Sequence, residues 1–217
     1  MIVDLHLKGN LVIVVGGGSE ALKKVEALLT QNCKILVISD KVNSKIKNFA
    51  VRKKIQLKKM KLENAGFLSK YKPYLVIAST DDKSLNRKIV EKARKMHCLV
   101  YASDDPDVSD FAHPSVINIE DTIQVAVSTG GKSPAMAKKI KSQAEKVFKK
   151  IVKKEDIFQI KLQEIVREQA KKRIPTQVER KKFLYTVIND KEIKQLIKEN
   201  NLKKAQKLAT VILKDWK

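Results

Sequence analysis

Short apolar runs alternate with helical patterns through the first half of the chain. The run LVIVVG at 11–16 is almost continuously apolar, as in a strand that is buried on both faces of a parallel sheet. After it, Ala21, Val25, Leu28 and Leu29 recur at the spacing of one helical face. Strands separated by helices predict an α/β fold with a Rossmann-like, right-handed, doubly wound parallel sheet. The further strands are expected at 33–39, 55–62, 74–80 and 98–103.

The pattern changes after Pro114. Two tightly joined strands are expected, and a helix follows for which Ser133 is the N-cap and Pro134 the first residue. A hairpin with one helix is too small to be stable alone, so we expect it to complete its core against a second copy. The rest of the chain has helical patterns only. The predicted organisation is a Rossmann domain at 1–113, a small α+β dimerisation region at 114–152 and a helical domain at 153–217.

The chain is strongly basic, with a net charge of +22. Residues 132–217 hold 25 lysines and arginines against 10 acidic residues, so most of the excess lies in the helical half. Few aromatic residues accompany these lysines as stacking platforms for bases, which argues against a nucleic-acid partner. A solvated helix surface, a polyanion site and a site for a multiply carboxylated small molecule all remain open.

The cysteines and the apolar runs exclude several other classes. Cys33 and Cys98 lie far apart in strand-like runs without a C-x-x-C spacing, so we expect neither a disulfide nor a permanent metal site. No apolar run reaches the roughly 18 residues that a membrane span needs, and no cationic leader precedes one. We therefore expect a cytoplasmic protein without a membrane partner.

Three glycines between the first strand and the first helix are the strongest local motif. Gly16, Gly18 and Ala21 form G-x-G-x-x-A, in which missing side chains let the backbone approach a pyrophosphate at a helix N-terminus. Asp40 ends the second strand, near the distance at which an acid meets the adenosine ribose. An acid there favours NAD over NADP, because it would repel a 2′-phosphate. The alternative is a tight turn that only packs the strand on the helix.

Several stretches together resemble the precorrin-2 dehydrogenase and sirohydrochlorin ferrochelatase family, which makes sirohaem. The resemblance implies NAD-dependent oxidation of precorrin-2 to sirohydrochlorin by a homodimer. Some members also insert ferrous iron, so chelation of ferrous or cobaltous ion stays open here. The stretches are LHLKGNLVIVVGGGSEALKKVEALL, LVIASTDDKSLNRKI, VYASDDPDVSDFAHPSVI, VAVSTGGKSPAMAKKIK and ERKKFLYTVI.

This chemistry requires an acid–base residue. Removing a hydride from a reduced tetrapyrrole leaves a proton to be taken up, so a base is needed near the carboxyl ends of the strands. Asp104 follows the fifth strand and matches the family's catalytic aspartate, while the adjacent Asp105 is a candidate to share its role or bind substrate. The alternative is that Asp104, Asp105 and Pro106 only make a turn.

The resemblance also implies cofactor and substrate contacts. Ser19, Glu20, Asp40 and Lys41 match cofactor-binding positions of the family. Thr80 and Asp81 are expected to face the same crevice, although they could equally cap the following helix.

Candidate substrate contacts lie further along the chain. His113 could carry a proton, bind a metal ion or contact the substrate, but a lone histidine is more often a packed side chain. Gly130, Gly131 and Lys132 lead into a helix N-terminus that could receive a substrate carboxylate; the alternative is a flexible link.

A non-enzymatic function is the contrasting hypothesis. A dimeric Rossmann module could sense NAD and act on a polyanionic partner through its basic helices. Residues 153–217, however, lack the pattern of a helix-turn-helix with a defined recognition face.

Overall fold

The computed structural model of the chain describes residues 2–216. It divides into two compact units, with the boundary between His113 and Pro114. Each unit has its own apolar core, and each is described here by itself.

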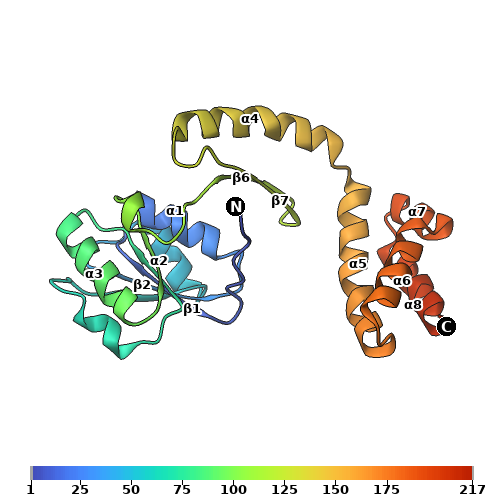
Figure 1. Cartoon of the computed structure of the whole chain (residues 1–217), viewed down its shortest axis with the longest axis horizontal. Helices are drawn as coiled ribbons and strands as arrows, with labels where there is room; N and C mark the ends of the chain where they lie inside the picture. Colours follow the sequence, from blue (N-terminus) through green and yellow to red (C-terminus); the bar gives the residue numbers. More distant parts are fainter. Residues whose placement is uncertain (1, 217) are drawn as a thin grey trace. The chain divides into compact units, whose positions relative to one another are not determined.

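A five-stranded parallel sheet forms the centre of the first unit, in the order β3-β2-β1-β4-β5 (Figure 1). This order, with helices between the strands, confirms the predicted Rossmann-like α/β fold. The strands are β1 (Leu11–Val15), β2 (Lys34–Ser39), β3 (Gln56–Lys59), β4 (Leu75–Ala78) and β5 (Leu99–Ala102). The helices are α1 (Ser19–Leu28), α2 (Ser44–Val51) and α3 (Lys83–Lys95), with 3₁₀ turns η1 (Gly66–Lys70) and η2 (Pro106–Val108).

Both faces of this sheet are covered, which explains the continuous apolar runs. On one face Val12 and Val14 pack against α1 and α2, and on the other Ile13 and Val15 pack against α3 and η1. Because successive side chains of a strand point to opposite faces, every residue of β1 needs to be apolar.

Two details differ from the sequence prediction. The third strand is shorter than the expected 55–62, because β3 is an edge strand that pairs only with β2 and has exposed lysines. Helix α2 was not expected, since Ile46 is its only buried residue and gives no helical period.

The second unit begins with an antiparallel hairpin, β6 (Ser115–Ile119) and β7 (Ile123–Val127), followed by α4 (Pro134–Ile151). One face of the hairpin packs on α4 through Ile117, Ile119 and Phe148. Four more helices surround the fully buried Phe183. They are α5 (Lys154–Arg173), α6 (Gln177–Asn189), α7 (Lys191–Lys198) and α8 (Leu202–Lys214). In the described part of the chain, no helix combines the length and the apolar character that crossing a membrane requires.

Candidate functional site

The turn after β1 needs glycine for two separate reasons. Gly16 has φ +117°, and a Cβ there would lie 2.1 Å from the carbonyl oxygen of Ser79. A Cβ on Gly17 would lie 2.2 Å from the carbonyl oxygen of Lys41. Both positions are therefore fixed by close packing against neighbouring backbone. The sequence motif did not single out Gly17, although the run of three glycines was the available signal.

Gly18 has a different environment. A Cβ at this position would meet no atom within 4 Å, so packing does not explain the glycine. An open position at the second glycine of G-x-G-x-x-A is what the close approach of a pyrophosphate requires.

The N-terminus of α1 is also suited to an anion. Gly18 is its N-cap and provides no side-chain acceptor for the first-turn N–H groups. By contrast, a side-chain oxygen caps the first turns of α2, α3, α4, α6, α7 and α8. Uncapped N–H groups and the helix dipole together favour a phosphate. Ser19 and Glu20 begin this helix, and Glu20 forms an ion pair with Lys23 at 2.6 Å.

Asp40 and Lys41 follow β2 on the adjacent loop. The Ser39 hydroxyl donates to the Lys41 carbonyl oxygen at 2.7 Å, and Asp40 Oδ1 accepts from the Lys41 N–H at 2.8 Å. These bonds hold the loop whose backbone lies against Gly17. The exposed Asp40 carboxylate is thus fixed one strand away from the glycine turn, where it could accept from ribose hydroxyls.

A buried amide joins the ends of β4 and β5. Asn86, on α3, is only 1% exposed, and its Oδ1 accepts from the Thr80 N–H at 3.2 Å and the Thr80 hydroxyl at 2.7 Å. Its Nδ2 donates to the Thr80 carbonyl oxygen at 3.0 Å and to Asp104 Oδ1 at 2.9 Å. Asp104 itself is exposed. An accessible carboxylate is therefore held by a buried donor. Sequence reasoning missed Asn86, because an asparagine within a helix gives no signal of its own.

Asp105 and Asp81 have different surroundings from Asp104. The Asp105 carboxylate pairs with Arg87 at 2.7 Å through one oxygen and accepts from the Asp107 N–H at 3.1 Å through the other. It caps the turn η2, as the turn interpretation expected. The N-cap of α3 is Asp82, whose carboxylate accepts from the Leu85 N–H, rather than Thr80 or Asp81.

His113 packs in an aromatic cluster. Its ring lies edge-on to Tyr101, with 4.5 Å between centroids, and 5.4 Å from the ring of Phe111. Lys24 Nζ lies 4.3 Å above the Tyr101 ring. Burial of the ring and, second, the Lys24 charge lower the pKa of His113 to about 4. Much of the residue is exposed, yet even an ordinary histidine is mostly neutral at pH 7, so the ring is neutral either way.

The loop before α4 lies in the second unit. Gly130 and Gly131 have φ +60° and +81°, which explains the two glycines without a ligand. Ser133 Oγ caps the helix by accepting from the Met136 N–H at 3.3 Å. Lys132 lies between these two features.

Four candidate segments thus meet at one edge of the sheet. Gly16, Asp40, Thr80 and Asp104 follow β1, β2, β4 and β5, which are neighbouring parallel strands that all end at the same edge. His113 lies outside this group, in the Tyr101 cluster. Within residues 2–216, no group of three or more His, Cys, Asp and Glu side chains is placed to hold a metal ion.

The fold, the glycine turn and the free helix N-terminus define a Rossmann-type dinucleotide-binding protein. The chain belongs to the family described as "Putative NAD(P)-binding", which matches residues 3–115. A second family, the central region of sirohaem biosynthesis proteins, matches residues 121–143. These two matches, in this order, confirm the resemblance to the sirohaem-forming family that the sequence motifs predicted.

Individual relatives agree with this assignment. The siroheme synthase of Nitrosococcus oceani is 34% identical over 143 residues, which are 66% of this chain and 30% of that protein. The siroheme synthase of Mannheimia succiniciproducens is 28% identical over 99% of this chain and 43% of its own length. The chain therefore spans less than half of these relatives. The solved structure of SirC, a precorrin-2 dehydrogenase, has the same fold, with a TM-score of 0.65 and 20% identity over 95% of this chain and 99% of that one.

Proposed function

We propose that the protein is an NAD-dependent precorrin-2 dehydrogenase that forms sirohydrochlorin. The observation that carries the proposal is the hydrogen bond from Asn86 to Asp104, which holds an accessible carboxylate at the sheet edge that also bears the glycine turn. The relatives named siroheme synthase and the dehydrogenase with the same fold support this chemistry.

The reaction assigns a role to each part of this edge. Precorrin-2 loses one hydride and one proton to become sirohydrochlorin, and bound NAD⁺ supplies the hydride acceptor. The α1 N-terminus and Gly18 would hold the pyrophosphate, with Ser19, Glu20, Lys41, Thr80 and Asp81 as further cofactor contacts. The Asp104 carboxylate would accept the proton.

The choice of NAD follows from Asp40. Its exposed carboxylate would accept hydrogen bonds from the ribose hydroxyls and would repel a 2′-phosphate.

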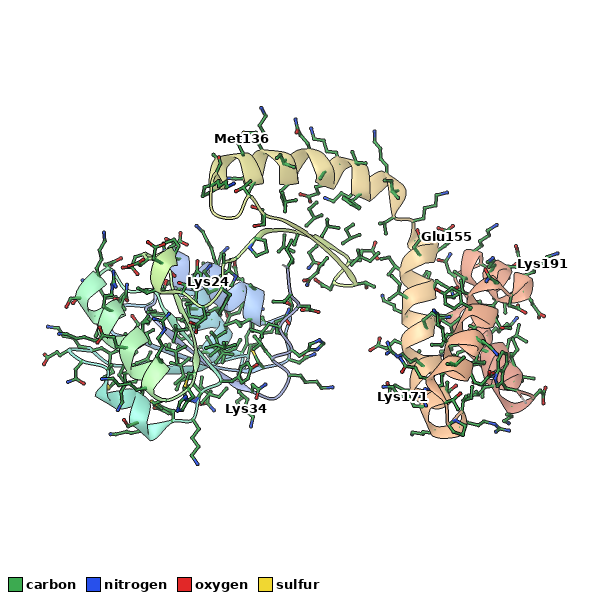
Figure 2. The ribbon with its side chains drawn as sticks, in the orientation of Figure 1. Lys24, Lys34, Met136, Glu155, Lys171 and Lys191 are labelled. Atoms are coloured by element: carbon green, nitrogen blue, oxygen red, sulfur yellow. The ribbon has the colours of Figure 1, made fainter. Side chains whose placement is uncertain are left out.

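The second unit would contribute dimerisation and substrate binding. The basic helices, whose lysine side chains Figure 2 draws around α5 to α8, suit a substrate with many carboxylates. Asp105, His113, Gly130, Gly131 and Lys132 remain predicted substrate contacts. Ferrous or cobaltous chelation and a cytoplasmic location also remain predictions.

The test is an anaerobic assay with purified protein, NAD and precorrin-2, in which absorbance follows NADH and sirohydrochlorin. We expect equal formation of both products. Asp104→Ala should lower kcat by about 10²- to 10⁴-fold, as removal of an acid–base group does, with NAD affinity unchanged. Asp107→Ala is the matched control, because Asp107 is an exposed acid on the same loop and should leave turnover at the wild-type rate.

Absence of turnover, with NAD still bound, would contradict the enzyme proposal. It would favour the alternative of a non-enzymatic NAD sensor. That alternative predicts salt-dependent binding of a polyanion such as random-sequence DNA, in a manner that NAD changes.

A further inference from the structure

Asp104 is held by a residue that belongs neither to the glycine motif nor to the strand ends. Asn86 lies one helical turn into α3 and is 1% exposed. The only other buried polar residue of the described chain is Ser39. A buried amide without partners is costly, so the bonds of Asn86 determine which way it can face.

The main chain fixes the orientation of this amide. The Thr80 N–H can only donate, and the Thr80 carbonyl oxygen can only accept, so the Asn86 oxygen must face the first and its nitrogen the second. The second hydrogen on that nitrogen then points to Asp104, at 2.9 Å. With the Thr80 hydroxyl on its oxygen, both donor and both acceptor positions of the amide are used.

This arrangement has a chemical consequence. An N–H donor stabilises a carboxylate that accepts and does not favour a protonated one. We propose that Asn86 is the positioning residue of the site: it orients the Asp104 carboxylate, and it ties that carboxylate to the Thr80 loop, where the cofactor is expected. This inference rests on the proposed dehydrogenase function.

Two further contacts from α3 support this assignment. Arg87 pairs with Asp105, and Arg94 pairs with Asp110 at 3.2 Å and also donates to the Val108 carbonyl oxygen. The segment after β5 is thus attached to α3 at several points, and Asn86 is the attachment that reaches Asp104 itself.

The first experiment uses Asn86→Asp, which keeps the shape and the acceptor for the Thr80 N–H but replaces the donor by a second carboxylate. We expect kcat to fall at least about tenfold and the acid limb of the pH–rate profile to move up by about one pH unit, because two adjacent carboxylates resist joint ionisation. The other charged groups on α3 and in the segments after β4 and β5 stay unchanged; they are Asp81, Asp82, Lys83, Arg87, Lys88, Glu91, Lys92, Arg94, Lys95, Asp105, Asp107 and Asp110.

The matched control is Asn48→Asp. Asn48 is exposed on α2 and receives the same change of charge, so we expect wild-type kcat and an unmoved pH profile. An active wild-type protein whose Asn86→Asp variant keeps the wild-type acid limb would overturn the inference and leave the proposed function intact.

A second measurement does not depend on turnover or on the folding of the Asn86 variant. In the NMR spectrum of the wild-type protein, the Asn86 side-chain amide signals should shift with pH as Asp104 ionises, and Asp104→Ala should abolish that shift. Amide signals that do not respond to Asp104 would refute the inference. A wild-type protein without turnover whose Asn86 signals do respond would instead contradict the proposed function and retain the pairing.

Discussion

The two units place their polar side chains in opposite ways. In residues 2–216 the buried polar residues are Ser39, at the end of β2, and Asn86, on α3, and both belong to the first unit. The cores of the second unit consist of apolar side chains, apart from Gln159 Nε2 and Trp216 Nε1, which are buried without a hydrogen-bond partner. Its ion pairs lie on helix surfaces at spacings of three and four residues. Burying a polar group costs stability unless it is fully hydrogen-bonded, and exposed ion pairs contribute little. The buried polar groups of the first unit therefore indicate a binding site, whereas the charged groups of the second unit lie on its surface.

The glycines give the largest expected effect, and they compare a turn of the first unit with a loop of the second. Gly16→Ala places a Cβ 2.1 Å from the Ser79 carbonyl oxygen at φ +117°, so the free energy of unfolding should fall by about 3 kcal/mol or more. At Gly130, in the second unit, a Cβ would meet no atom within 4 Å, but φ is +60°. Gly130→Ala should therefore lower the free energy of unfolding by only about 1–2 kcal/mol. Urea denaturation measures both values.

Gly18→Ala separates packing from binding at the same turn. Its Cβ meets no atom within 4 Å, so the stability should stay near that of the wild type, whereas NAD affinity should fall at least about tenfold. Isothermal titration calorimetry with NAD measures this. Unchanged affinity would mean that the turn serves packing alone.

Helix α4 supplies the next prediction, on the surface of the second unit. Met136, Ile140, Val147 and Ile151 are 41–61% exposed and lie within about 60° of one another around the helix, beside the face that packs on the hairpin. Figure 2 labels Met136 near the start of this stripe. An apolar arc that the hairpin covers only in part supports the predicted dimer contact.

Val147→Glu should raise the dimer dissociation constant by about 10- to 100-fold, or about 1.4–2.7 kcal/mol, because it places a charge in an apolar contact. Sedimentation velocity over a range of concentrations measures it. Ser142→Glu is the control, since it adds the same charge on the polar side of α4 and should keep the wild-type constant. A wild-type protein that is monomeric at tens of micromolar would contradict the dimer.

The sequence predicted most of the first unit because its signals are local. Buried parallel strands are continuous apolar runs, and the glycine motif marks the turn, so β1, β2, β4 and β5 were found close to their observed bounds. The role of Asn86 was not predicted, because it depends on hydrogen bonds to Thr80 and Asp104, six and eighteen residues away in the chain. The apolar spacing of a helix predicts which of its faces is buried. It does not predict that a buried asparagine on that face will donate a hydrogen bond to a residue on another segment.

The smallest effect concerns Lys24, which lies on α1 and is labelled in Figure 2. Its charge is partly buried in the first unit. Its Nζ donates to the Tyr101 hydroxyl at 3.2 Å. Burial lowers the pKa of Lys24 to about 8, against a smaller opposing effect of Glu20. Between pH 8 and the ordinary lysine value of 10.5 the unfolded chain binds the proton and the folded chain releases it, so stability should rise with pH.

The gain should be about 1 kcal/mol, because partial exposure screens the charge and reduces the effect of the full pKa shift. It should be seen as the difference between the wild type and Lys24→Met in urea denaturation at pH 7.5 and pH 9.5, conditions chosen on the two sides of about 8. Lys72→Met is the control, because Lys72 is exposed between η1 and β4, is not among the charges that act on Lys24, and should change with pH as the wild type does. Equal pH dependence in wild type and Lys24→Met would show that Lys24 stays charged throughout. The contrast between the units would then be sharper, with buried polar chemistry in the first unit confined to the sheet edge where Asn86 holds Asp104.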